Sequence, residues 1–184
     1  MEKYIIIGAI VLGLLILWVV KTYNKLVKLR NKVKDQWSQV EVELKKRFDL
    51  IPNIVETVKG YAKHEKDTFT QVVDARNAAL SAGSPTAEMD ADNKLSAALS
   101  KLFSLTEAYP ELKADTSFIS LQENLKEVEE KIAFARQFYN DTVLKYKDAI
   151  EMFPTVLIAG MLGFKQEKFF EASSAEKENV KVKF

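Results

Sequence analysis

Ionisable side chains are densest in residues 45–66, KKRFDLIPNIVETVKGYAKHEK. This stretch places the only histidine, His64, beside Glu65 and in the same segment as Asp49. A histidine near carboxylates is typical of a general acid–base set, because imidazole titrates near neutral pH and a carboxylate orients the ring. No serine, threonine or cysteine lies beside His64 in a nucleophile motif, and Asp67 at helical spacing offers an ordinary ion pair. We therefore interpret His64 as a surface or lightly packed residue and predict no catalytic residue.

A carboxylate-rich stretch later in the chain raises the question of a metal site. It contains Glu123, Glu127, Glu129 and Glu130. Di-iron sites in helical bundles need Glu-x-x-His motifs, whereas the residue three positions before the one histidine is Tyr61. The chain also has no cysteine and no glycine-rich phosphate loop followed by Lys-Ser or Lys-Thr. The sequence therefore predicts no metal, no cofactor and no enzymatic activity.

Length and charge limit the classes of protein further. The 184 residues suffice for one domain with a genuine core. Lys and Arg total 27 against 26 Asp and Glu. A nucleic-acid-binding protein needs a strong basic excess, so this balance argues against a nucleic-acid partner.

The first twenty residues differ in kind from the rest. Residues 4–20, YIIIGAIVLGLLILWVV, contain no charged side chain and approach the roughly 20 residues that a bilayer core requires. Tyr4 and Trp18 lie near the two ends, where aromatic rings favour the headgroup level. A cleaved signal peptide is the competing interpretation, but no small-x-small cleavage site follows the apolar run. We predict a retained anchor that contacts the lipid bilayer through residues 4–20.

A cluster of basic residues follows the anchor before the first acid, Asp35. Its members are Lys21, Lys25, Lys28, Arg30, Lys32 and Lys34. Because positive residues stay on the cytoplasmic side, the cluster predicts residues 21–184 in the cytoplasm and a very short N-terminus outside. The same lysines can bind anionic headgroups or simply form a solvated helix face.

Apolar residues then recur every three or four positions, as in the packed helices of a bundle. The first stripe comprises Leu26, Leu29, Val33, Trp37, Val40, Leu44, Phe48 and Ile51. Pro52 disfavours helical geometry in the residue before it, so we expect this helix to end near Leu50. A second helix would then start at Pro52 or Asn53 and run to the turn signal at residues 81–85.

Two further helices complete the pattern. One begins near Thr86 and closes at Pro110, and the other keeps a three-four alternation from Phe118 to Phe153, with Thr116 or Ser117 as its N-cap. The predicted fold is all-α, an N-terminal transmembrane helix continuing into an antiparallel bundle of about four long helices. Aromatic side chains at helical spacing are predicted in its core: Trp37, Phe134, Phe138 and Tyr139.

The predicted division is an anchor over residues 1–20, a cytoplasmic bundle over 21–153 and a tail over 154–184. Within the tail, the apolar segment TVLIAGMLGF either packs on the end of the bundle, which we favour, or stays exposed for a partner or the membrane surface. Val180 and Phe184 are candidate docking residues near its end.

The predicted corner at Pro52–Asn53 is a candidate surface for a protein partner. Polar residues around it would lie at the end of the bundle far from the membrane, and the candidate docking residues are Arg47, Asp49 and Asn53. Glu65 and Arg76 fall on the apolar stripe of the second helix. They either form a buried pair that fixes helix register or are exposed.

Several separated motifs resemble one known family. These are the N-terminal anchor with YNKLVKLRNKVKDQWSQVEVELKKRFDLIPNIVETVKGYAKHE, then LQENLKEVEEKIAFARQFYND at 121–141, FPTVLIAGMLGFKQEKFFEA at 153–172 and the final VKVKF. Over nearly its whole length the chain is similar to the LemA family of bacterial membrane proteins. The resemblance implies a single-pass protein of the bacterial inner membrane with a cytoplasmic helical bundle, and no established activity or cofactor.

Two hypotheses for function follow. The first is a membrane-anchored helical scaffold or interaction protein that presents its bundle to a protein partner or to a second copy, as a homo-oligomer. The alternative is a membrane-surface or membrane-remodelling protein that uses the basic cluster and the apolar C-terminal segment.

Overall fold

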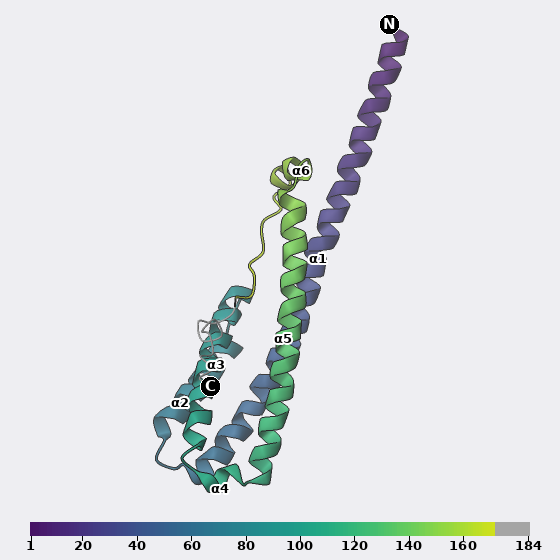
Figure 1. Cartoon of the computed structure of the whole chain (residues 1–184). Coiled ribbons are helices and arrows are strands. Elements are labelled where there is room, and N and C mark those ends of the chain that lie inside the picture. Colours follow the sequence, from purple (N-terminus) through teal and green to yellow (C-terminus); the bar gives the residue numbers. More distant parts are fainter. Residues whose placement is uncertain (172–184) are drawn as a thin grey trace, which may run out of the picture. The chain divides into compact units, whose positions relative to one another are not determined.

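The computed structural model describes residues 1–171. Within this range the regular secondary structure is helical throughout, with no strand (Figure 1). The helices are α1 (Glu2–Tyr61), α2 (Lys66–Leu80), α3 (Pro85–Thr106), α4 (Pro110–Lys113), α5 (Thr116–Glu151) and α6 (Thr155–Met161). The predicted all-α fold with one long apolar N-terminal helix is confirmed, whereas the antiparallel four-helix arrangement stays a prediction.

Contacts between residues separate the chain into two compact units. The first unit contains Met1–Ser38 and Gln137–Phe169, and the second contains Gln39–Arg136 with the described residues Phe170 and Glu171. The two longest helices, α1 and α5, therefore each contribute to both units. The predicted division into anchor, bundle and tail is based on which residues would lie in the membrane, so the two compact units do not test it and it stays a prediction.

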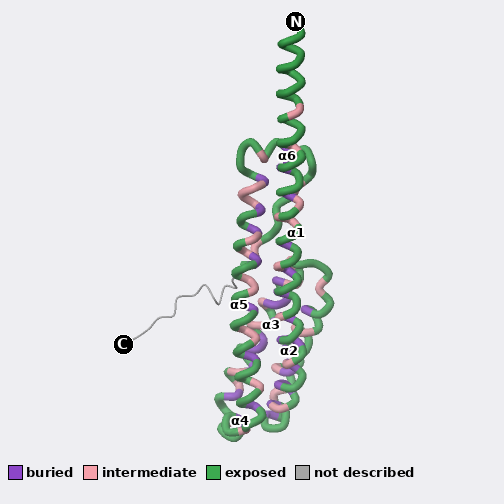
Figure 2. Tube along the Cα trace, turned by 90° about the vertical axis from the view of Figure 1, so that its right-hand side faces the viewer, coloured by how far each residue is buried: buried purple, intermediate pink, exposed green. Residues whose placement is uncertain are grey.

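In the first unit, none of the described residues covers the N-terminal part of α1. It is long and apolar enough to cross a membrane, and none of its most apolar window is buried. Figure 2 shows this part as exposed helix up to the level of α6. Further along, the predicted apolar stripe packs against the second half of α5. The buried residues are Leu26, Val33 and Trp37 of α1 and Tyr139, Val143, Tyr146 and Ile150 of α5.

The second unit buries the continuation of that stripe together with the shorter helices. Here α2 packs against α3, and α4 contacts α3. Buried side chains include Leu44, Phe48, Ile51 and Ile54 of α1, Phe69 and Val72 of α2, Leu95, Leu99 and Leu102 of α3, and Leu125 and Ile132 of α5. These are positions of the three-four stripes, so the sequence periodicity identified this core correctly.

The predicted end of the first helix near Leu50 is wrong, because α1 continues through Pro52 to Tyr61. A proline inside a helix removes one N–H and leaves the carbonyl four residues earlier without its usual partner. In this chain that carbonyl belongs to Phe48, and Nε of Arg76 donates a hydrogen bond to it over 2.7 Å. An arginine from α2 thus replaces the missing donor, which explains how the helix passes a proline.

The chain reverses at residues 62–65 instead, between α1 and α2. The predicted corner at Pro52–Asn53 must be corrected accordingly. The N-cap of α5 also differs from the prediction, since it is Asp115, one residue before Thr116. Its carboxylate accepts a hydrogen bond from the Phe118 N–H over 2.8 Å, which is the usual role of an aspartate at this position.

The aromatic predictions divide into two pairs. Trp37 and Tyr139 are buried, and their rings meet edge to face with centroids 5.3 Å apart. Phe134 and Phe138 are exposed to 62% and 58%, so their assignment to the core is wrong. Helical spacing alone does not predict which aromatic residues are buried, because residues on an exposed side of a helix recur with the same period as residues on its buried side.

After α5 the chain forms α6 and then an extended segment. Ile158 and Ala159 of α6 are buried, which agrees with the favoured interpretation that this apolar segment folds back. Several neighbouring apolar side chains nevertheless stay outside, as described below. The proposed docking of Val180 and Phe184 lies outside the described residues.

Candidate functional site

The basic cluster occupies the part of α1 that directly follows its apolar segment. Lys21, Lys25, Lys28 and Lys32 recur at helical spacing on one face, and they line a groove together with Asn24 and Leu29. All four lysines are exposed. The face therefore offers positive charge that can bind anionic groups.

Three members of the cluster, Arg30, Lys32 and Lys34, differ in their contacts. Lys32 forms a 3.0 Å ion pair with Asp35. Arg30 is half-buried, and its guanidinium lies 5.3 Å from the centre of the Phe164 ring, which also meets Tyr23 at 5.9 Å. Arg30 therefore helps to hold the segment after α6 against α1, and Lys34 is exposed.

Apolar side chains around α6 are exposed beside this part of α1. The exposed large residues are Met152, Phe153, Val156, Leu157, Met161 and Leu162, with Met161 exposed to 86%. No charged residue occurs from residue 152 to residue 164. Contiguous apolar surface of this kind marks a contact with a partner or a membrane.

The segment after α6 runs back along the first unit through polar and ring contacts. The Tyr139 hydroxyl donates to the Lys168 carbonyl oxygen over 2.9 Å. The Lys147 ammonium lies 5.9 Å from the Phe169 ring centre. Burial, with a smaller effect of the nearby Glu167 carboxylate, raises the pKa of Tyr139 to about 12, so this donor keeps its proton at neutral pH.

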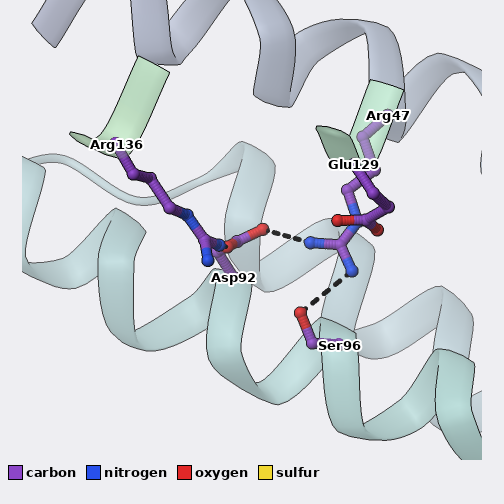
Figure 3. Close-up of polar contacts among 5 residues, drawn as sticks. All are labelled: Arg47, Asp92, Ser96, Glu129 and Arg136. Atoms are coloured by element: carbon purple, nitrogen blue, oxygen red, sulfur yellow. Dashed lines mark hydrogen bonds and ion pairs between the residues drawn. The ribbon is translucent and has the colours of Figure 1, made fainter. Parts of the chain in front are cut away.

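A cluster of ionised side chains is buried in the second unit (Figure 3). Arg47 is 1% exposed, and its guanidinium donates to Asp92 Oδ1 over 2.6 Å and to Ser96 Oγ over 3.0 Å. Its Nε lies 2.9 Å from Glu129 Oε1. Arg136 donates to the second oxygen of Asp92, so that this fully buried carboxylate lies between two guanidinium groups.

The cluster joins three helices by charge. Arg47 belongs to α1, Asp92 to α3, and Glu129 and Arg136 to α5. The guanidinium of Arg136 also stacks 4.1 Å from the ring centre of Phe170, which is buried. Two cations and two anions balance one another, and arginine suits such a site because its planar fork binds several acceptors at once. The cluster fixes helix positions; Arg47 and Asp92 are its buried members, whereas the Glu129 side chain is 39% exposed.

Glu88 lies at the edge of this region, close enough to Glu41 and Asp92 for their negative charges to repel its own. Burial, followed by the charges of Glu41 and Asp92, raises the pKa of Glu88 to about 7. A raised pKa is typical of functional carboxylates, but it also occurs in structural clusters of acids. No nucleophile or cofactor-binding group joins Glu88 among the contacts described for it, so we interpret it as structural.

The structure separates the three candidate docking residues. Arg47 is buried, so its predicted place on an accessible surface is wrong. Asp49 is exposed in a 2.8 Å ion pair with Lys45, and Asn53 is exposed one turn later in α1. A docking role for Asp49 and Asn53 stays a prediction.

The histidine region contains no further site of chemistry among the described residues. His64 is exposed in the turn between α1 and α2. Across residues 1–171, no three or more His, Asp or Glu side chains are placed to hold one metal ion. Arg76, expected on the apolar stripe, is half-buried and binds the Phe48 carbonyl.

Asp92 is the buried charged residue that the sequence interpretation missed. It lies three residues before Leu95 and so continues the stripe of α3 backwards by one step. Arg47 likewise follows Leu44 by three residues. Opposite charges at stripe positions of two helices therefore indicated that a buried ion pair could form, although the sequence did not show which residues would pair.

Comparison with known proteins agrees with this architecture. Residues 36–184 match the model of the LemA family. The chain belongs to the LemA family. LemA is also the name of a relative from Metamycoplasma hominis, "Protein LemA", which is 22% identical over 181 residues and covers 96% of this chain and 81% of that protein.

Two other relatives of this LemA-family chain bear a magnetosome name. They are "Magnetosome protein MamQ" of Magnetospirillum gryphiswaldense and "Magnetosome protein MamQ 1" of Paramagnetospirillum magneticum, each 24% identical over 179 residues. The match covers 83% of this chain and spans 66% of the length of each MamQ protein. These names denote no enzymatic activity. The apolar helix near the N-terminus is compatible with membrane association.

Proposed function

We propose that the chain is a membrane-anchored helical scaffold without catalytic activity. Residues 4–20 of α1 would cross a bacterial inner membrane once, and the helices from residue 21 on would present a surface to a protein partner or a second copy. The observation that carries the anchor is an apolar helical segment that none of the residues 1–171 buries, followed at once by exposed lysines.

The lysine excess also supports an orientation. With the basic cluster on the cytoplasmic side, the N-terminus lies outside and residues 21–184 lie in the cytoplasm. Protease added to intact cells should then spare residues 21–184 and digest them only after the membrane is permeabilised. Digestion in intact cells would reverse the orientation without affecting the anchor itself.

The support for a protein partner is the exposed pair Phe134 and Phe138 on α5. Aromatic residues are enriched at the centres of protein interfaces, and the two rings are one helical turn apart. Asp49 and Asn53 on α1 supply a second, polar candidate surface.

Crosslinking in intact membranes followed by mass spectrometry tests the partner. The double variant Phe134→Ser with Phe138→Ser should reduce the crosslinked product several-fold, whereas Ile119→Ser, another exposed apolar position of α5, should leave it unchanged. Asp49→Ala with Asn53→Ala tests the polar surface in the same way. Unchanged products in both sets would contradict a docking role for these residues.

The membrane-surface alternative is favoured by one observation, the exposed apolar side chains around α6. It is compatible with the scaffold, because the two proposals use different parts of the chain.

A further inference from the structure

The residues from Met152 to Leu162 form an apolar patch that nothing in the described chain covers. Phe153 is exposed to 79%, Leu157 to 60% and Met161 to 86%. Ile158 and Ala159 are buried on the other side of α6, so the helix is docked and its outer face is left open. The patch belongs to the first unit, as does the apolar segment of α1.

Ring contacts place this patch beside the end of the apolar segment. Phe164, three residues after Met161, packs on Tyr23 and under Arg30. Tyr23 is only three residues beyond Val20, where the apolar run ends. Figures 1 and 2 both show α6 at the end of α5, at the level beyond which α1 continues toward the N-terminus.

We propose that α6 and its flanking residues, Met152 to Leu162, insert their exposed apolar side chains into the membrane interface of the leaflet from which α1 emerges. This inference rests on the proposed membrane span of residues 4–20. The occupant of the patch is lipid, at the boundary between headgroups and acyl chains.

Two features favour lipid over a second copy of the chain. The patch is continuous in space with the end of a segment that itself needs lipid, so both apolar surfaces can be covered by one bilayer. The flanking charge also fits, because Lys21, Lys25 and Lys28 are exposed at the same end of the unit and can bind anionic headgroups. Apolar residues on one side with lysines nearby are typical of elements that lie in an interface.

A short helix suits this role because a helix that lies in the membrane interface does not have to cross the bilayer. With seven residues α6 is far below the length of a span. Its outer face would enter only the upper part of the acyl region, while Ile158 and Ala159 keep it attached to the unit. The chain would then contact the bilayer at two points, the span and α6, and the first unit would be held at a fixed tilt and depth.

The absence of cysteine makes a direct test available. Single substitutions Leu157→Cys and Met161→Cys in the full chain would be labelled with the environment-sensitive fluorophore NBD and reconstituted into vesicles of phosphatidylcholine and phosphatidylglycerol. Leu12→Cys serves as a control inside the span. Leu144→Cys, an exposed apolar position of the same unit, is the matched control; it lies about 12 Å before Met152 along α5.

The expected result is a blue-shifted emission at Leu157→Cys and Met161→Cys and several-fold stronger quenching by brominated lipids than at Leu144→Cys. Bromine near the headgroup end should quench these two labels best, whereas bromine deep in the acyl chains should quench Leu12→Cys best. Helix content measured by circular dichroism verifies that each variant folds, and Phe153→Cys replaces any that does not.

Other outcomes separate the two proposals. Water-like emission at both α6 positions with normal quenching at Leu12→Cys would overturn the α6 inference and leave the span intact. Blue-shifted α6 labels that brominated lipid does not quench would show a protein cover, such as a second copy, and also overturn it. Loss of quenching at Leu12→Cys would refute the span itself.

Discussion

The two compact units of this chain use different means to hold the same long helices. The second unit buries charged groups, with Asp92 between Arg47 and Arg136. In the same unit Arg76 donates to the Phe48 carbonyl, which Pro52 leaves without a backbone donor. The first unit relies on rings and one tyrosine hydroxyl to hold its extended segment. Buried charges are costly to leave unpaired, whereas ring contacts lose energy gradually when they are altered. We therefore expect sharp mutational effects in the second unit and graded effects in the first.

The largest effect should come from Asp92→Ala. This change leaves Arg47 buried and without its main counter-ion, and breaking a buried pair in this way costs about 3–5 kcal/mol. Chemical denaturation of the purified chain measures the free energy of unfolding. Asp90→Ala, at an exposed position of the same helix, should cost little, and equal losses in both variants would contradict a special role for the buried cluster.

The proline in α1 permits a sharper test, a double-mutant cycle between Pro52 and Arg76. Arg76→Ala alone should cost about 1–2 kcal/mol, because the buried Phe48 loses the donor to its carbonyl. In a Pro52→Ala background the alanine N–H can bind that carbonyl, so the same substitution should cost much less. Additive effects of the two substitutions would show that Arg76 does not compensate for the proline.

In the first unit, Tyr139→Phe should have a smaller and more local effect. It removes the hydrogen bond to the Lys168 carbonyl while keeping the ring packed on Trp37, at a cost of about 1 kcal/mol. Hydrogen exchange of the amides after residue 164 should accelerate more than exchange elsewhere. Tyr23→Phe, which keeps a half-exposed ring, is the control, and similar exchange in the two variants would argue against the hydroxyl contact.

The smallest effect should be a dependence of stability on pH that arises from Glu88 in the second unit. Its pKa of about 7 in the folded chain lies above the ordinary value of 4.5, so the folded state binds the proton more tightly than the unfolded state. The contribution of this group is therefore full below about pH 4.5 and is lost as the pH rises through about 7. Because the side chain is partly exposed, we expect a change below about 1 kcal/mol.

Glu88→Gln should flatten that pH dependence and stabilise the chain at pH values above the pKa of Glu88. Denaturation curves measured across the neutral range, with Glu123→Gln at an exposed position as the control, test this expectation. A profile unchanged by Glu88→Gln would assign the pH dependence to other groups.

The sequence predicted the buried apolar stripes of the helices, but it did not predict the effect of Pro52 or the exposure of Phe134 and Phe138. Leu26 to Ile51 and Leu95 to Leu102 were placed correctly because burial follows the three-four period directly. Pro52 was misinterpreted, since its effect on α1 depends on an arginine that only the folded chain brings to Phe48. Phe134 and Phe138 were misplaced because periodicity gives the spacing of a stripe and not the side that is covered.

The candidate sites were predictable to different degrees for the same reason. The basic cluster after the apolar run depends only on local sequence, and its lysines are exposed as expected. Arg47 was expected at the surface because it was assigned to the polar residues around the predicted Pro52–Asn53 corner, whereas pairing with Asp92 and Glu129 makes its burial tolerable. This pairing depends on the relative positions of three helices, which no local sequence pattern predicts.

The bond from Arg76 to Phe48 has a consequence for the order in which the chain is made. The two residues are 28 positions apart, so the ribosome releases the proline-containing part of α1 well before its donor exists. Until Arg76 emerges, the nascent helix has a weak joint after Phe48, and its two halves can bend independently. A segment synthesised later, α2, thus supplies the donor that completes the hydrogen bonding of a helix synthesised earlier.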